Sequence, residues 1–315
     1  MHPLIEVQHI NKAFGGLHVI NDCSIRVEKG SITGMIGPNG AGKSTLFNLI
    51  AGALTPDSGQ ILLDGEDITT LSADQRFHKG LLRTFQIAHE FSQMSALENL
   101  MMVPPRQAGE NLFNTWFKPS LVREQEAEVR RRALEVIDFV GLHHVRNELA
   151  GNLSGGQKKL LELGRTMMTD AKIVLLDEIA AGVNRTLLGD LMGNIERLNR
   201  EMGYTFLVIE HDMDMISRLC DPVIVLAQGS VMVEGHIEAI QNDPAVIEAY
   251  FGSDAAWPRQ YASHRHDQQP THGYNNMIAS GDPSATLAET RLCHRHRHPP
   301  SHCLKHATCT AVMAV

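Results

Sequence analysis

The segment from residue 37 to residue 45 has the residue types and spacing that phosphate binding requires. It fits the pattern G-x-x-x-x-G-K-[ST] and reads Gly37, Pro38, Asn39, Gly40, Ala41, Gly42, Lys43, Ser44 and Thr45. Glycines let consecutive backbone N–H groups turn toward phosphates at the positive N-terminus of a helix. In such a loop Lys43 reaches the β- and γ-phosphate oxygens, and the Ser44 hydroxyl ligates Mg²⁺. The segment therefore predicts a phosphate-binding loop.

A second candidate site is the carboxylate pair Asp177-Glu178, which follows the apolar run 173–176. In a parallel sheet such a strand delivers both carboxylates to the C-terminal edge, where ligands bind. Asp177 can hold Mg²⁺ through water, and Glu178 can orient and polarise the water that attacks a γ-phosphate. An isolated Asp-Glu pair also fits a solvated strand end, but the phosphate loop in the same chain favours the catalytic interpretation.

A third signal is the string LSGGQ at residues 153–157, which precedes the amphipathic stretch KKLLELGR. Ser154, Gly155 and Gly156 place a hydroxyl and two bare backbone positions at the start of a helix. This arrangement predicts another helix N-terminus that binds an anion. An enzyme with one phosphate loop has no obvious use for a second anion-binding helix N-terminus, because the loop already holds the phosphates.

The elements that must position these residues alternate along residues 1–252. Each of three apolar runs of strand length precedes a segment with helical period: TGMIG (33–37), IVLLD (173–177) and YTFLVIE (204–210). The alternation predicts an α/β fold, with parallel strands and helices packed on both faces of the sheet. An early β-rich region contains the Asp64-Gly65 turn signal. Residues 95–152 have a mostly helical pattern and are interpreted as an inserted subdomain.

Composition and charge narrow the classes of partner and compartment. Lys and Arg total 28 against 36 Asp and Glu, a formal net charge of -8, which disfavours nucleic acid as a partner. No apolar run approaches the roughly 18 residues needed to span a bilayer. The N-terminal segment MHPLIEVQHINKAF predicts a first strand rather than a secretory signal. The odd set of five cysteines suits a reducing compartment, so the cytoplasm is the expected location.

The composition changes after residue 252. Residues 253–315 contain 8 of the 17 His and 3 of the 5 Cys without a sustained period, and this tail is predicted to be mostly disordered. The stretch from Cys293 to His306 offers thiolate and imidazole groups, which are zinc ligands. The Cys293 to Cys303 spacing matches no zinc-finger template, and a nonfunctional, compositionally biased extension is the alternative. No metal is assigned to the tail.

The spacing of the three signals resembles that of ABC-type ATPases. LSGGQ, the family signature, follows the phosphate loop by about 110 residues and precedes the carboxylate pair by about 20. The phosphate loop at 37–45 corresponds to Walker A, and residues 173–178 correspond to Walker B. The resemblance covers about residues 3–252. It implies a P-loop NTPase (RecA-like) core with an antiparallel β subdomain and an inserted α-helical subdomain.

The resemblance also implies how the site is assembled. Two copies, or this chain and a paralogue, would dock head to tail as a dimer, and neither chain alone would complete a site. Each ATP would lie between Lys43 of one chain and the signature residues Ser154, Gly155, Gly156 and Gln157 of the other. Magnesium would be held by Ser44, Gln86 and Asp177.

Four further positions receive roles from the resemblance. Glu178 would be the catalytic carboxylate, and Gln86, in RTFQ, would sense Mg²⁺ and the attacking water. His211, after LVIE, would contact the γ-phosphate, and Phe14 would stack on adenine. Ile179 departs from the family pattern, which usually has proline there. Because proline fixes φ, we expect Ile179 to loosen the turn that aims Glu178.

Several strings resemble the ATP-binding subunits of importers for branched-chain and other hydrophobic amino acids. They are RTFQIAHEFSQMSALENLMM, EIAAGVN with Asn184, EHDMDMI and VIEAYFG. The resemblance implies transmembrane permease subunits as partners, a periplasmic substrate-binding protein as an indirect partner, and a peripheral location on the inner face of the cell membrane. Residues 87–150 are expected to present a groove to a short cytoplasmic helix of the permease.

Two alternatives to this function remain. Importers for urea or short amides are built alike, so the cargo stays open. A soluble P-loop phosphotransferase or regulator would instead be a stable monomer in which Ser154 is dispensable. The LSGGQ string discriminates against this second class, because transfer of phosphate to an acceptor requires no second phosphate-facing helix end.

Overall fold

The computed structural model describes residues 3–84, 90–105, 107–110 and 116–251. These residues lie in a compact unit that spans residues 1–265. The predictions for Gln86 and for the tail, residues 253–315, fall outside the described residues. Among the described helices, none is both long and apolar enough to cross a membrane.

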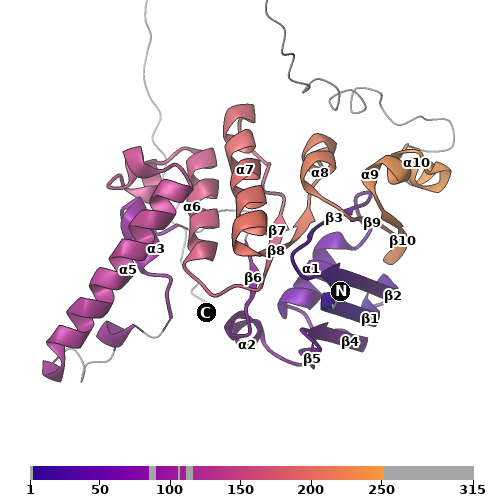
Figure 1. Ribbon diagram of the computed structural model, residues 1–315. Coiled ribbons are helices and arrows are strands. Elements are labelled where there is room, and N and C mark those ends of the chain that lie inside the picture. The colour runs from indigo at the N-terminus through magenta and orange to yellow at the C-terminus, as the bar shows by residue number, and fades with distance from the viewer. Residues whose placement is uncertain (1–2, 85–89, 106, 111–115, 252–315) are drawn as a thin grey trace, which may run out of the picture. The chain divides into compact units, whose positions relative to one another are not determined.

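The chain begins with an antiparallel sheet in the order β2-β1-β4-β5 (Figure 1). Its strands are β1 (Pro3–Phe14), β2 (Leu17–Glu28), β4 (Ser58–Leu63) and β5 (Glu66–Asp67). The predicted turn joins β4 to β5, and both of its residues have positive φ, 53° at Asp64 and 79° at Gly65. Asp-Gly tolerates this conformation best, so the early β-rich region and its turn are confirmed.

The second sheet has six strands in the order β10-β9-β3-β8-β7-β6. They are β3 (Ile32–Ile36), β6 (Leu81–Arg83), β7 (Ile173–Asp177), β8 (Thr205–Ile209), β9 (Val223–Ala227) and β10 (Ser230–Gly235). All pairings are parallel except that of β9 with β10. Every residue of β3, β7 and β8 is buried, as expected for strands covered on both faces. The predicted α/β class is confirmed, with one antiparallel edge strand added.

Helices cover both faces of this parallel sheet. One core joins α1 (Lys43–Ala51) to the antiparallel sheet and to Leu175 and Leu207. The other core joins α6 (Gly155–Met167), α7 (Arg185–Met202) and α8 (Met213–Leu219) to Val174 and Phe206. Successive residues of β7 and β8 thus enter opposite cores, as the alternation of a strand requires. Helices α9 (Ile237–Gln241) and α10 (Pro244–Phe251) add to the second core. Helix α2 (Ala73–His78) joins α1 through its buried Arg76, which donates hydrogen bonds to the carbonyl oxygens of Leu49 and Ile50.

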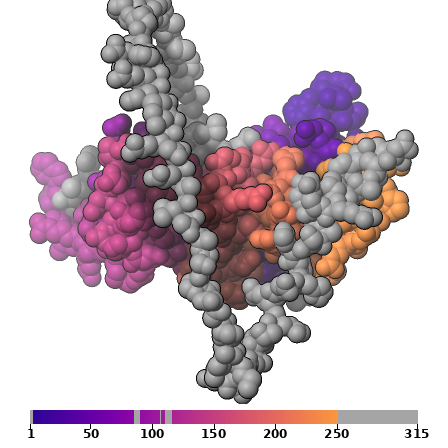
Figure 2. All heavy atoms as spheres, turned by 90° about the horizontal axis from the view of Figure 1, so that it is seen from above, coloured from indigo at the N-terminus to yellow at the C-terminus, as the bar shows by residue number. Residues whose placement is uncertain are grey.

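The middle segment is mostly helical, as predicted. It contains α3 (Ala96–Met101), α5 (Pro119–Phe139) and three short 3-10 turns at Ala108–Glu110, His143–Val145 and Ala150–Asn152. Helix α6, just beyond the predicted boundary, packs on α3 and α5. At Gly164 an added Cβ would lie 3.1 Å from Val136 and 3.3 Å from Leu100. Figure 2 shows the magenta residues of this segment on one side of the molecule and the orange residues that follow β8 on the other.

Candidate nucleotide-binding and hydrolysis site

The predicted phosphate loop runs from the end of β3 into α1. A Cβ at Gly37 would lie 2.2 Å from the carbonyl oxygen of Leu226. A Cβ at Gly42, where φ is 100°, would lie 2.7 Å from Cδ1 of Ile20. Neither Gly37 nor Gly42 therefore has room for a Cβ, because backbone and core atoms lie too close. The exposed middle is formed by Asn39 and Gly40, and Ser44 is exposed at the start of α1.

Lys43 places a buried ammonium group inside this loop. Its side chain is 6% exposed, and Nζ donates hydrogen bonds to the carbonyl oxygens of Gly37 at 2.6 Å and Pro38 at 3.1 Å. Burial lowers the pKa of Lys43, while the nearby carboxylates of Glu178 and Asp177 oppose the decrease. The loop and the helix N-terminus together form a concentrated positive site suited to an anion.

Asp177 ends β7 in a buried position beside a guanidinium group. Arg83 Nη2 donates to Asp177 Oδ2 at 2.7 Å, and Nη1 of Arg83 donates to Asn48 Oδ1 on α1. The three side chains join β6, β7 and α1 near the phosphate loop. Arg83 begins the RTFQ string, but the sequence alone predicted no role for it. No local pattern could have shown this contact, because Arg83 and Asp177 are 94 residues apart in the sequence.

The structure brings Glu178 and His211 together across 33 residues of sequence, since Nε2 of His211 lies 3.1 Å from Oε1 of Glu178. Glu178 has a φ of 49°, which costs a residue with a Cβ about 1–2 kcal/mol. Its backbone N–H donates to the carbonyl oxygen of Ile209 at 2.9 Å. Strands β3, β8 and β7 are parallel neighbours, and the phosphate loop follows β3. Both side chains therefore lie at the same C-terminal edge of the sheet as the loop.

The signature segment caps α6 with its own side chains. Oγ of Ser154 accepts a hydrogen bond from the N–H of Gln157 at 3.3 Å, and Oε1 of Gln157 accepts one from the N–H of Ser154 at 2.9 Å. This is a capping box. Ser154 and Gly155 are exposed, whereas Gly156 is buried. Among the described residues, no hydrogen bond joins this segment to the phosphate loop of the same chain.

Gly155 and Gly156 differ in what surrounds them, and this leads to a prediction. A Cβ at Gly156 would lie 2.4 Å from Cδ1 of Leu187 on α7, but one at Gly155 would lie 3.8 Å from the oxygen of Gly182. We expect Gly156→Ala to lower the free energy of unfolding by about 1–3 kcal/mol, as overpacking does. Gly155→Ala is the matched control and should not lower it, because alanine favours a helix over glycine. Urea denaturation measures both, and equal stability of the two variants would contradict the packing difference.

Phe14, the predicted adenine platform, ends β1. Its ring is 47% exposed, and Nζ of Lys12 lies 5.7 Å from the ring centroid. The next strand, β2, packs on the phosphate loop, since a Cβ at Gly42 would lie 2.9 Å from the oxygen of Val19. Phe14 is thus an exposed aromatic ring on the hairpin that contacts the loop.

Comparisons with known proteins identify the family. The family described as "ABC transporter" matches residues 20–181. The probable branched-chain amino acid transport ATP-binding protein LivG of Archaeoglobus fulgidus is 40% identical over 254 residues, which cover 79% of this chain and 96% of LivG. The chain belongs to the ABC transporter ATP-binding family. It is an ATP-hydrolysing transport ATPase.

Other comparisons extend this similarity. The high-affinity branched-chain amino acid transport ATP-binding protein BraF of Pseudomonas aeruginosa is 40% identical over 250 residues, which cover 79% of this ABC ATPase and 98% of BraF. The family described as "Branched-chain amino acid ATP-binding cassette transporter" matches residues 231–256. The crystal structure of the ADP conformation of an ABC transporter cassette has a TM-score of 0.68 and 36% identity, and covers 80% of this chain and 100% of that one. The predicted P-loop NTPase fold is therefore confirmed.

Ile179 and Asn184 shape the segment that connects Glu178 to helix α7. The side chain of Ile179, which stands where proline is usual in the family, is 4% exposed and lies in the core formed with α6 and α7. Asn184 caps α7, because its Oδ1 accepts a hydrogen bond from the N–H of Leu187 at 2.9 Å. Asparagine and aspartate are equivalent in this role. Ile179 is thus held by burial and not by a fixed φ, and the expected loosening of the turn stays a prediction.

Proposed function

We propose that this ATPase powers the import of branched-chain or other hydrophobic amino acids through separate permease subunits. The observation on which this rests is the 40% identity to LivG and BraF across 96% and 98% of those proteins. The match of the branched-chain family to residues 231–256 supports the same cargo class. The matched residues include α9 and α10, so this similarity is separate from the phosphate loop and the carboxylate pair.

We propose that two ATPase subunits, identical or paralogous, enclose each nucleotide between them. The buried ammonium of Lys43 and the exposed N-terminus of α6 are both suited to phosphate, but no hydrogen bond joins them among the described residues of one chain. A second subunit docked head to tail would supply Ser154, Gly155, Gly156 and Gln157 to the phosphates held by Lys43. Phe14 would stack on the adenine ring.

The residues near the loop fit Mg²⁺ as a cofactor. Asp177 is 6% exposed, and Ser44 is exposed at the N-terminus of α1. Carboxylate and hydroxyl oxygens are the ligands that Mg²⁺ prefers, and Gln86 would add an amide oxygen. When bound, Mg²⁺ neutralises charge on the phosphates. Arg83 orients Asp177 through the 2.7 Å contact of Nη2 with Oδ2.

Hydrolysis would use the pair at the sheet edge. The Glu178 carboxylate would accept a hydrogen bond from the attacking water and polarise it toward the γ-phosphate. His211 holds Oε1 of Glu178 at 3.1 Å and would contact the γ-phosphate with the same ring. Closure of the dimer on ATP and its reopening after hydrolysis would be a population shift driven by the different affinities of the two states for nucleotide.

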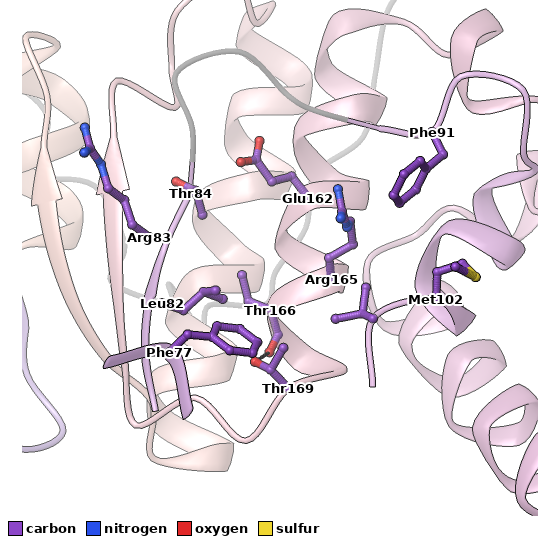
Figure 3. A pocket seen from close by; sticks show the side chains of 11 residues that line it. Phe77, Leu82, Arg83, Thr84, Phe91, Met102, Glu162, Arg165, Thr166 and Thr169 are labelled. Atoms are coloured by element: carbon purple, nitrogen blue, oxygen red, sulfur yellow. Dashed lines mark hydrogen bonds between the residues drawn. The ribbon is translucent and has the colours of Figure 1, made fainter. Parts of the chain in front are cut away.

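A groove beside α6 is suited to the permease. Its volume is about 320 Å³, and it lies between β6, α6 and residues 91–103. Figure 3 shows Glu162 and Arg165 of α6 between Arg83 and Thr84 on one wall and Phe91 and Met102 on the other. Phe91 and Met102 are 49% and 55% exposed. We propose that a short cytoplasmic helix of the permease packs on these apolar side chains, which would place this chain peripherally on the inner face of the membrane.

Uptake measurements test the proposed function. In cells that lack the gene, radiolabelled leucine, isoleucine and valine should enter slowly, and the wild-type gene should restore uptake whereas a Lys43→Met gene should not. Urea and acetamide uptake, measured in the same cells, is the control for cargo class. Unchanged amino-acid uptake with lost urea or amide uptake would assign the second cargo class, and unchanged uptake of all five solutes would contradict a role in import.

A further inference from the structure

Glu210 links the two turns that present Glu178 and His211. It directly follows β8, and its side chain is 3% exposed. Oε1 accepts a hydrogen bond from the N–H of Ala180 at 2.7 Å, and Oε2 accepts one from the N–H of His211 at 3.3 Å. A single carboxylate therefore joins the turn after β7 to the turn after β8, across 30 residues of sequence.

The buried charge of Glu210 is unfavourable unless its hydrogen bonds offset it. Burial raises the pKa of Glu210, the N–H groups of Ala180 and His211 oppose this increase, and the neighbouring carboxylates of Asp212 and Glu178 add to it. An apolar residue of similar size would fill the same volume without this penalty. The carboxylate instead provides two oxygens that accept hydrogen bonds from two backbone N–H groups, those of Ala180 and His211.

One of those two positions, Ala180, lies two residues after the strained residue Glu178. Glu178 has a φ of 49°, and such a conformation persists only where the surroundings fix it from several sides. On one side, the N–H of Glu178 itself donates to the oxygen of Ile209 at 2.9 Å. On the other side, the N–H of Ala180 donates to Glu210 at 2.7 Å. The end of β8 thus holds the chain both at Glu178 and two residues after it.

We propose that Glu210 is a positioning residue for ATP hydrolysis, which fixes Glu178 and His211 relative to each other through the backbone and without touching nucleotide. This inference rests on the proposed catalytic role of Glu178. The contact of 3.1 Å between Oε1 of Glu178 and Nε2 of His211 requires both turns to keep their separation, and Glu210 hydrogen-bonds to both turns.

The variant Glu210→Gln tests this role, because an amide has one acceptor oxygen for two N–H donors. We expect kcat for ATP hydrolysis to fall about 10- to 100-fold, the loss that a small misplacement of a reacting group produces. KM and the dissociation constant for ATP should stay within about twofold, since the phosphate loop is unchanged. An unchanged kcat would overturn the inference. Equal losses in kcat and in ATP affinity would also overturn it, because they would indicate general damage to the fold.

Asp212→Asn is the matched control. Asp212 also accepts two backbone N–H groups, from Asp214 at 2.9 Å and Met215 at 3.1 Å, but with the same oxygen, Oδ1. An asparagine carbonyl can replace that oxygen, so the same change from acid to amide should leave kcat within about twofold. If Glu210→Gln does not fold, Glu210→Asp is measured by the same criteria, since it retracts both oxygens along a shorter stem.

A double variant separates this inference from the proposed function. If Glu210 acts through Glu178, the combination of Glu210→Gln with Glu178→Gln should turn over ATP at about the residual rate of Glu178→Gln alone. Multiplied losses would overturn the inference. Undiminished turnover in Glu178→Gln itself would instead contradict the proposed site. Lost turnover in Glu178→Gln with normal turnover in Glu210→Gln would leave that site intact and remove only the positioning role.

Discussion

Glu178→Gln should lower the rate of ATP hydrolysis about 10²- to 10⁴-fold, the contribution typical of a positioned general base. An amide cannot accept the proton of the attacking water, but it has the same size and can still contact Nε2 of His211, which lies 3.1 Å from Oε1 in the wild type. ATP affinity should persist, because Lys43 and the loop glycines are untouched. Single-turnover hydrolysis of radiolabelled ATP and equilibrium binding measure the two quantities. A wild-type rate would exclude Glu178 as the catalytic carboxylate.

The same variant should accumulate as a dimer under saturating ATP. If nucleotide closes the dimer and hydrolysis reopens it, slow hydrolysis shifts the population to the closed state. Light scattering after size-exclusion chromatography detects this state. Adding Gly155→Glu is the control, because a carboxylate at the exposed N-terminus of α6 would face the triphosphate of the partner site. The double variant should stay monomeric, and a monomeric Glu178→Gln protein with bound ATP would contradict the proposed arrangement.

Lys43→Met should weaken ATP binding at least about 100-fold, which corresponds to about 2.7 kcal/mol. Methionine has a similar length but no charge, so the loop loses the ammonium that would meet the β- and γ-phosphates. The fold should keep its stability without nucleotide, because burial already lowers the pKa of Lys43 and an apolar side chain is compatible with a site that is 6% exposed. Isothermal titration and thermal unfolding measure the two effects.

Lys79→Met is the control for this loss of charge. Lys79 forms an exposed ion pair with Glu66, with Nζ 2.7 Å from Oε1, and exposed pairs contribute little to stability. ATP affinity should be unchanged in this variant. If Lys43→Met also binds ATP normally, the loop at 37–45 does not hold the phosphates, and the proposed nucleotide site is wrong.

The sequence was sufficient for features that depend on local pattern. The glycines and Lys43 identify the loop because a narrow backbone geometry limits their substitution, and the buried strands β3, β7 and β8 are visible as short apolar runs. The family resemblance placed Glu178 and His211 in one site, and the structure brings them within 3.1 Å. Their catalytic roles, like that of Ser154, stay predictions.

The sequence was insufficient where a contact joins distant segments. Arg83 and Asp177 are separated by 94 residues, and only the pairing of β6 with β7 brings them together. The buried carboxylate of Glu210 gave no local signal, since its partner Ala180 lies 30 residues earlier. Gly156 was interpreted as an open approach for phosphate, but its lack of a side chain is also required by Leu187, which belongs to another helix. Side-chain packing of this kind has no periodicity to detect.

Helix α6 is continuous, and Ser154 and the groove beside Glu162 lie at different heights along its axis. Glu162 is eight residues from Ser154, a distance of about 12 Å at 1.5 Å per residue. At Gly164 the helix packs closely against α3 and α5, and at Gly156 it packs closely against α7. A displacement of α6 at the groove would therefore also displace Ser154 by a comparable amount, because a continuous helix moves as one body. If the proposed permease helix docks in this groove, its movement would reach the residues that we propose to face the nucleotide of the partner subunit.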